Sequence, residues 1–245
     1  MINNFFTSIF FLLFSATTPT PITTTHIDPP VNETAETTTK AVSLASKAEA
    51  IYSALNANSM SLPGAECFSK AYIGYTHLKK QGKIKKDLLT VVDFSKSSNT
   101  KRLWIIDMAT KTVLYNTLVS HGKNSGNEFA TAFSNDANSY KSSLGFYATG
   151  EIYRGKHGES LRLDGLERGI NDNARARAVV MHAADYVSED FAKRHTRIGR
   201  SLGCPALPNE LNKEVINLIQ GKSCLFIYHP TKQYASATKL LQDII

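Results

Sequence analysis

From residue 88 onward the chain alternates short apolar segments with polar turns, and this rhythm constrains the fold more than any other feature. The segments are rich in Val, Ile, Leu and aromatic residues, which pack well on a pleated surface and favour strands. The first three follow one another closely, so we expect a meander. The predicted strands cover residues 88–94, 102–107, 112–119, 145–149, 160–163, 178–182 and 224–228.

Apolar residues at helical spacing precede the strands in residues 41–55 and again in 67–78, with a Pro–Gly break between them. We expect this helical pair, within residues 41–86, to pack against the strands as a cap. One further helix is predicted at 208–221. The sequence therefore predicts a mostly β fold, a β-sandwich with an N-terminal helical pair and peripheral helices.

The N-terminus predicts export. Residues 5–14 form an apolar run and small residues follow it, so residues 1–18 are typical of a signal peptide, although no Lys or Arg precedes the run. An uncleaved anchor is the alternative, but the run is short for a transmembrane helix. Residues 19–40 are rich in Thr and Pro and predict an extended linker. We therefore expect the protein in the periplasm or cell envelope.

The formal net charge of +7 suggests attraction to an anionic envelope polymer or membrane surface. The lysines at 79–86 form one cluster without the interleaved aromatic residues that stack on bases, so we expect no nucleic-acid partner. We also expect a monomer that has no stable membrane insertion after processing.

The chain has three cysteines, Cys67, Cys204 and Cys224, so one disulfide would leave one free thiol. A Cys67–Cys224 pair is the only one that spares Cys204. Cys224 also lies in an apolar run and is equally interpretable as a buried strand residue, so the pairing stays open.

Cys204 lies in a setting that is unusual for a core thiol. Gly203 lets the backbone approach a ligand closely, and Pro205 stiffens the exit from the turn. His182 ends the apolar run 178–181, so a strand end can present its imidazole to this loop. The two residues predict a cysteine nucleophile with a histidine base, the alternative being a buried structural Cys and a core His.

The sequence His-Ala-Ala-Asp-Tyr at 182–186, followed by Ser-Leu-Gly-Cys-Pro-Ala-Leu-Pro at 201–208, resembles the catalytic signature of the murein L,D-transpeptidases, in the branch that lacks the signature arginine. A weaker resemblance extends upstream through 119–126 and 143–147, and the whole covers roughly residues 88–230. The resemblance implies a catalytic domain at 87–231 with the family's β-sandwich. A C-terminal tail or helix follows at 232–245.

The resemblance also implies roles for individual residues. Cys204 matches the nucleophile and His182 the general base, whose imidazole is oriented by the backbone carbonyl of Ala183. The backbone N–H groups of Gly203 and Cys204 are the expected oxyanion donors, and Ser201 is expected to brace the turn. The family cleaves peptidoglycan stems between a diamino acid at position three and D-Ala at position four. It then transfers the acyl group to an amine of another stem, giving a 3→3 cross-link.

Two positions depart from the commoner family pattern, because Leu202 stands where a His is usual and Ala206 where an Arg is usual. Positive charge from Arg197 or Arg200 would replace the missing Arg and favour the thiolate. The predicted substrate-binding residues are Arg200, Arg197, His121 and Tyr147. His121 follows an apolar strand and Tyr147 is an aromatic residue within one, and both kinds of residue are also typical of a protein core.

The function predicted is that of an exported cysteine acyltransferase acting on peptidoglycan stem peptides, which are its expected partners. An L,D-carboxypeptidase or hydrolase, in which water replaces the amine, and a non-catalytic peptidoglycan-binding protein are the alternatives. A zinc site is disfavoured, because His182, Asp185, His195 and Cys204 do not have a standard ligand spacing. We therefore expect neither a metal nor another cofactor.

Overall fold

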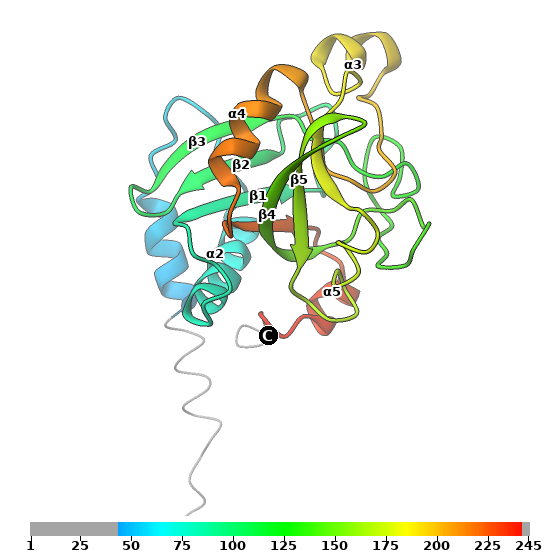
Figure 1. Cartoon of the computed structure of the whole chain (residues 1–245). Coiled ribbons are helices and arrows are strands. Elements are labelled where there is room, and N and C mark those ends of the chain that lie inside the picture. Colours follow the sequence, from blue (N-terminus) through cyan, green and yellow to red (C-terminus); the bar gives the residue numbers. More distant parts are fainter. Residues whose placement is uncertain (1–43, 242–245) are drawn as a thin grey trace, which may run out of the picture. The chain divides into compact units, whose positions relative to one another are not determined.

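The computed structural model describes residues 44–241, so the predicted signal peptide and linker lie outside the described residues. Figure 1 shows the arrangement, in which a helix over residues 44–53 precedes the labelled elements. The helices are α2 (Ala65–Lys80), α3 (Glu189–His195), α4 (Asn209–Ile219) and α5 (Lys232–Ala237). The strands are β1 (Leu88–Asp93), β2 (Leu103–Asp107), β3 (Thr112–Thr117), β4 (Gly145–Gly155), β5 (Gly158–Gly165), β6 (Val180–Ala183), β7 (Ala206–Leu207) and β8 (Cys224–Tyr228).

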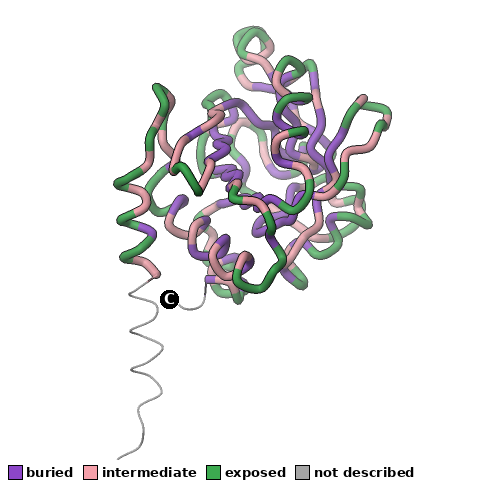
Figure 2. The backbone as a smooth tube through the Cα atoms, turned by 60° about the vertical axis from the view of Figure 1, so that its left-hand side comes forward, coloured by how far each residue is buried: buried purple, intermediate pink, exposed green. Residues whose placement is uncertain are grey.

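The strands of residues 44–241 form one continuous sheet in the order β3-β2-β1-β8-β4-β5-β6-β7. Strand β8 lies in its middle, parallel to β1 and antiparallel to β4. Every residue of β8 is buried, as is all of β1 after its first residue, and Figure 2 shows this buried interior in purple. Because both faces of these strands are covered, their sequences are continuously apolar rather than alternating.

Helix α2 packs on β1 and β8, and its buried side chains belong to the same hydrophobic core as the strands. Gly74 permits the close approach, because an added Cβ would lie 2.0 Å from the ring of Phe146 in β4. That ring stacks on Phe226 of β8, with the centroids 4.1 Å apart. Helix α2 therefore covers this part of the sheet and shares one core with it.

Helix α4 covers a different part of the sheet, contacting β4, β5 and β6 through the buried residues Val215, Ile216 and Ile219. This helix positions β6, which carries His182. Helix α3 buries none of its residues and begins at a capping contact in which Ser188 Oγ accepts from the Phe191 N–H at 3.1 Å.

The predicted fold class, mostly β with peripheral helices, is confirmed. Three features go beyond the prediction, and one of them is the short strand β7. Strands β4 and β5 extend into a long hairpin whose pairing reaches Gly155 and Gly158, and helix α3 was not expected. The outer half of the hairpin carries charged, exposed residues, so its sequence lacks the apolar pattern that marks the other strands.

Candidate active site

Cys204 lies half-buried in the turn between α3 and β7. Gly203 has a φ of +126°, which side-chain-bearing residues rarely adopt, and an added Cβ there would lie 2.9 Å from the Lys141 carbonyl oxygen. The Cys204 thiol donates to the Ala178 carbonyl at 3.7 Å and accepts from the Val180 N–H at 3.5 Å. The turn therefore directs the thiol toward the start of β6.

Ser201 braces this turn through its hydroxyl group. Its hydroxyl donates to the Cys204 carbonyl at 2.6 Å and accepts from the Gly203 N–H at 3.0 Å. The second contact corrects another expectation, because the Gly203 N–H is already used within the turn and is not free for an oxyanion. The Cys204 N–H has no acceptor among residues 44–241 and is the donor that remains.

His182 in β6 is buried, and its ring is held in one tautomer. Nδ1 lies 2.8 Å from the Ala183 carbonyl oxygen, and since a carbonyl only accepts, Nδ1 carries the proton and Nε2 presents a lone pair. Burial lowers the pKa of His182; the contact with Ala183 opposes this shift, and the neighbouring His157 and Lys156 add to it. The imidazole is therefore neutral and suited to accept a proton.

The sheet brings the two groups to one place. Strands β6 and β7 pair in parallel with His182 opposite Ala206, two positions after Cys204. The thiol contacts the N–H of Val180, and His182 follows that residue by two positions, which is roughly 7 Å along a strand. The Cys204 turn and His182 therefore lie side by side at this end of the sheet.

The charges that act on the thiol differ from those predicted. Burial raises the pKa of Cys204, and the positive charges of Arg177 and Lys156 are among the influences that oppose this shift. The expectation that Arg197 and Arg200 favour a thiolate is therefore wrong. Other cations act on the thiol, and the net effect of its surroundings is to raise its pKa. The resting group is a thiol, so it requires a base.

Arg200 is held by another loop. Its Nη1 donates to the carbonyls of Lys123 at 3.0 Å and Gly126 at 2.8 Å and to Asn127 Oδ1 at 2.9 Å, because a β-bridge between Gly122 and Ser201 brings the two loops together. Arg197 donates to the carbonyl of its neighbour Ile198 at 2.8 Å. In this structure the Nη1 group of each guanidinium thus donates to backbone carbonyls.

Arg177 is the cation that the structure places beneath the Cys204 turn. It donates to the carbonyls of Ser134 at 2.9 Å and Lys141 at 2.8 Å and to the hydroxyls of Ser143 and Ser139. A Cβ added at Gly203 would lie 3.6 Å from its Nη2. Arg177 therefore ties residues 134–143 together beside the Cys204 turn, and it supplies there the positive charge that was expected from Arg197 or Arg200.

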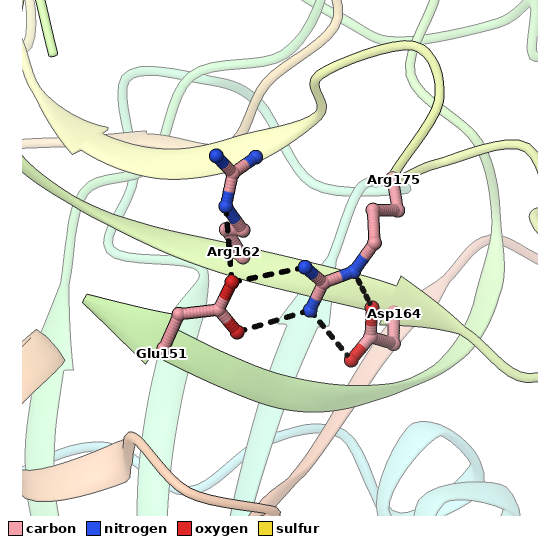
Figure 3. A network of polar contacts seen from close by, with 4 residues as sticks. All are labelled: Glu151, Arg162, Asp164 and Arg175. Atoms are coloured by element: carbon pink, nitrogen blue, oxygen red, sulfur yellow. Dashed lines mark hydrogen bonds and ion pairs between the residues drawn. The ribbon is translucent and has the colours of Figure 1, made fainter. Parts of the chain in front are cut away.

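A second arginine, Arg175, anchors the loop that carries Arg177 to the hairpin of β4 and β5. Figure 3 shows Arg175 between the carboxylates of Glu151 and Asp164, with Arg162 also paired to Glu151. These groups are largely exposed and lie on β4, β5 and the loop that leads to β6. The network fixes this loop two residues before Arg177.

His121 and Tyr147 lie in the interior, so the prediction that they bind substrate is wrong. His121 is fully buried; its Nδ1 accepts from Arg102 Nη2 at 2.8 Å and its Nε2–H donates to the Gly126 carbonyl at 3.3 Å. Burial and the charge of Arg102 lower the pKa of His121 to about 4. Tyr147 is also fully buried and donates to the Ser143 carbonyl at 2.9 Å.

The remaining predicted groups are separate from one another. Asp185 accepts a hydrogen bond from Asn209 at the start of α4. Cys67 and Cys224 are buried free thiols, so the disulfide considered for them is not formed. Within residues 44–241, no three His, Cys, Asp or Glu side chains are grouped in a way that would hold a metal ion.

Two site residues beyond Arg177 were not predicted, and both belong to the hairpin turn between β4 and β5. The ring of His157 stacks on His182 with centroids 4.4 Å apart and an angle of 21° between the planes. Lys156 precedes it and acts electrostatically on both Cys204 and His182. The only sequence signal was a Gly-Lys-His-Gly turn at 155–158, which by itself indicates an exposed loop.

Comparison with known families identifies the family of the chain. Residues 59–228 match the model of the L,D-transpeptidase catalytic domain. The matched region spans most of the chain and contains α2, the whole sheet and both Cys204 and His182. The chain therefore belongs to the L,D-transpeptidase catalytic-domain family. No curated protein sequence matches it.

Solved structures similar to this chain include an L,D-transpeptidase from Mycobacterium smegmatis, at 12% identity and a TM-score of 0.36 over 58% of this chain and 59% of that one. L,D-transpeptidase 3 from Mycobacterium tuberculosis is similar at 12% identity and a TM-score of 0.36, over 58% of this chain and 61% of that one. The helical cell shape determining protein Pgp2 (K307A mutant) from Campylobacter jejuni is similar at 11% identity and a TM-score of 0.40, over 70% of this chain and 58% of that one. The chain thus spans less than two thirds of their lengths.

Proposed function

We propose that this protein is a cysteine acyltransferase of peptidoglycan stem peptides, with Cys204 as nucleophile and His182 as general base. The observation that carries the proposal is the fixed tautomer of His182, whose Nδ1–H is held by Ala183 and whose Nε2 is left with a lone pair, on the strand that pairs with the segment directly after the half-buried Cys204. Membership of the L,D-transpeptidase catalytic-domain family supplies the substrate class.

The first half-reaction uses these groups in sequence. His182 Nε2 takes the thiol proton as the Cys204 sulfur forms a bond to the carbonyl carbon of the residue before D-Ala. The tetrahedral intermediate places its negative oxygen at the Cys204 N–H. When the C–N bond breaks, His182 returns the proton to the departing nitrogen of D-Ala, and a thioester remains on Cys204.

In the second half-reaction the amine of another stem attacks the thioester. That amine loses a proton to His182, the new C–N bond forms, and the thiol is restored as the C–S bond breaks. If water attacks the thioester in place of the amine, the protein is a hydrolase, which is the second candidate function for the same site. Both share the acyl-enzyme and differ only in the acceptor.

An exported location fits this substrate, because peptidoglycan lies outside the cytoplasm. The apolar run and small residues at 1–18 support export, and the net charge of +7 favours an anionic wall. Within residues 44–241, no helix is both long and apolar enough to cross a bilayer. We propose that the protein acts as a monomer in the periplasm or cell envelope.

Intact-protein mass spectrometry of the purified full chain with a carbapenem tests the nucleophile, because a strained β-lactam amide traps a reactive thiol as a stable acyl adduct. We expect one drug-sized adduct on the wild type and none on Cys204→Ala. Cys67 and Cys224 serve as internal controls, since they are buried thiols on the same chain. An adduct that persists in Cys204→Ala, or its absence from the reduced wild type, would overturn the assignment.

Tetrapeptide stems then separate transfer from hydrolysis. A cross-linked dimer together with free D-Ala indicates transpeptidation, whereas a tripeptide with free D-Ala and no dimer indicates hydrolysis. Binding of stems without release of D-Ala would leave the protein as a peptidoglycan-binding module.

A further inference from the structure

The turn between β4 and β5 projects a second imidazole onto the proposed base. The hairpin pairs in antiparallel register as far as Gly155 opposite Gly158, so Lys156 and His157 form its end. Both side chains are exposed, yet the His157 ring stacks on buried His182 at 4.4 Å. The acyl-transfer steps described above use neither residue.

The charge of Lys156 reaches both halves of the proposed catalytic pair, because it lowers the pKa of the Cys204 thiol and that of the His182 imidazole. Within residues 44–241, Lys156 forms no ion pair with a carboxylate. The arginines near the turn differ in this respect. Arg177 holds four oxygen atoms of the protein through both terminal nitrogens, and Arg200 holds three through Nη1, so both are already engaged by protein groups.

The reaction chemistry places a negative group beside this hairpin. His182 delivers its proton to the nitrogen of the departing amino acid, so that nitrogen lies at the imidazole. The α-carboxylate of a C-terminal amino acid is separated from its nitrogen by a single carbon atom. It therefore lies next to whatever surrounds the His182 ring, and on the stacked face this is the end of the hairpin.

We propose that Lys156 and His157 form a binding site for the α-carboxylate of the amino acid that leaves from, or enters at, the Cys204 thioester. The inference rests on the proposed function. Lys156 supplies the charge and His157 a hydrogen-bond donor. An amine that attacks the thioester follows the path of the departing nitrogen in reverse, so an α-amino acid acceptor presents its carboxylate to the same two side chains.

The donor experiment compares two tetrapeptide stems that end in D-Ala or in D-alaninamide, using the full chain. The quantity measured is kcat/KM for release of the terminal residue. We expect the wild type to prefer the carboxylate by about tenfold, and Lys156→Gln to reduce this preference by about five- to tenfold, which is typical of one charged contact near the surface. His157→Phe keeps a ring for stacking but loses the donor, so we expect a smaller reduction.

Lys213→Gln is the matched control, because Lys213 is exposed on α4 and its loss removes the same charge from the molecule. It should keep the wild-type preference, which separates a local contact from the effect of net charge. A rate loss in Lys156→Gln that is equal for both stems would mean that the lysine does not recognise the carboxylate, and would overturn the donor half of the proposal.

The acceptor experiment starts from the thioester and compares a free D-amino acid with its amide. A reduced carboxylate preference in Lys156→Gln in either experiment supports the site and assigns it to that half-reaction. Unchanged preference in both overturns it, while acyl-enzyme formation on Cys204 leaves the proposed function intact. If the wild type forms no thioester, the proposed function fails, and this inference fails with it.

Discussion

Replacement of Arg177 by methionine tests whether the Cys204 turn depends on the arginine beneath it. Methionine fills much of the same space but donates no hydrogen bond. The change leaves the carbonyls of Ser134 and Lys141 and two serine hydroxyls without their charged donor. An unsatisfied buried group costs about 1–3 kcal/mol, and water can reach part of this half-buried cluster, so we expect a loss of about 2–4 kcal/mol in unfolding free energy.

The effect on acylation follows from the contact with the turn. A Cβ at Gly203 would lie 3.6 Å from the Arg177 guanidinium, so the variant lacks the group that packs against the turn. A displacement of about 1 Å at a reacting group can cost roughly 10² in rate. We expect acylation by a carbapenem to slow by about 10- to 100-fold, which corresponds to about 1.4–2.7 kcal/mol of activation free energy.

Urea unfolding and time-resolved intact mass measure the two effects separately. Arg175→Met is the matched control two residues away, because Arg175 also bridges several groups but lies in an exposed network. We expect it to cost no more than about 1 kcal/mol and to leave acylation unchanged. A folded Arg177→Met protein that acylates at the wild-type rate would refute the argument that this guanidinium positions the turn.

Three further predictions concern the thiol and the core. Because burial raises the pKa of Cys204, its alkylation by iodoacetamide, measured with Cys204→Ala as the blank, should reach half its maximal rate above the pH of an ordinary thiol; a midpoint below that pH contradicts the assignment. Gly74→Ala forces a methyl group against Phe146, so its unfolding midpoint in urea should fall by an amount equivalent to about 1–2 kcal/mol, and an unchanged midpoint would mean that α2 packs less closely. Glu167 is buried with its pKa raised, so its folded form holds the proton longer than its unfolded form as pH rises. We therefore compare the unfolding free energy of the wild type with that of Glu167→Gln. The difference, wild type minus variant, should fall as pH rises through the ordinary pKa of 4.5 and should level off above the folded pKa. A difference that rises with pH would contradict the raised pKa of Glu167.

The sequence predicted those parts of the site whose chemistry depends on neighbours in the chain. The turn around Cys204 is built from Ser201 and Gly203, and the tautomer of His182 is held by the very next residue. Such contacts are short-range, and the resemblance of these segments to the family implied them position by position. The strands were predicted for a similar reason, since each is a local apolar run.

Contacts between distant loops could not be predicted in this way. Arg200 is close to Cys204 in sequence, but the bridge between Gly122 and Ser201 offers its guanidinium three oxygens of another loop. Arg177 and Lys156 are far from Cys204 in sequence and reach it only because β4, β5 and β6 are neighbours in the sheet.

Helix α3 and the outer hairpin escaped prediction because neither shows an apolar stripe. The helix buries none of its residues, so periodicity gives no signal, and only the cap at Ser188 marked its start. Residues Glu151 to Gly155 of β4 are partly or fully exposed and carry charges, which resemble a loop when read without their partner strand.

The position of β8 has a consequence for how the molecule is made. This strand is the last of the sheet to be synthesised, yet it joins the part that contains β1 to β3 with the part that contains β4 to β7. A ribosome-bound chain that lacks Cys224–Tyr228 therefore has two separate sets of strands and no strand to join them. Closure requires pairing across more than a hundred residues of chain, from β1 to β8, and such non-local pairing is slow. The sheet of this chain therefore closes only after its final strand has been made, so Cys204 and His182 are both synthesised before the sheet that brings their segments together is complete.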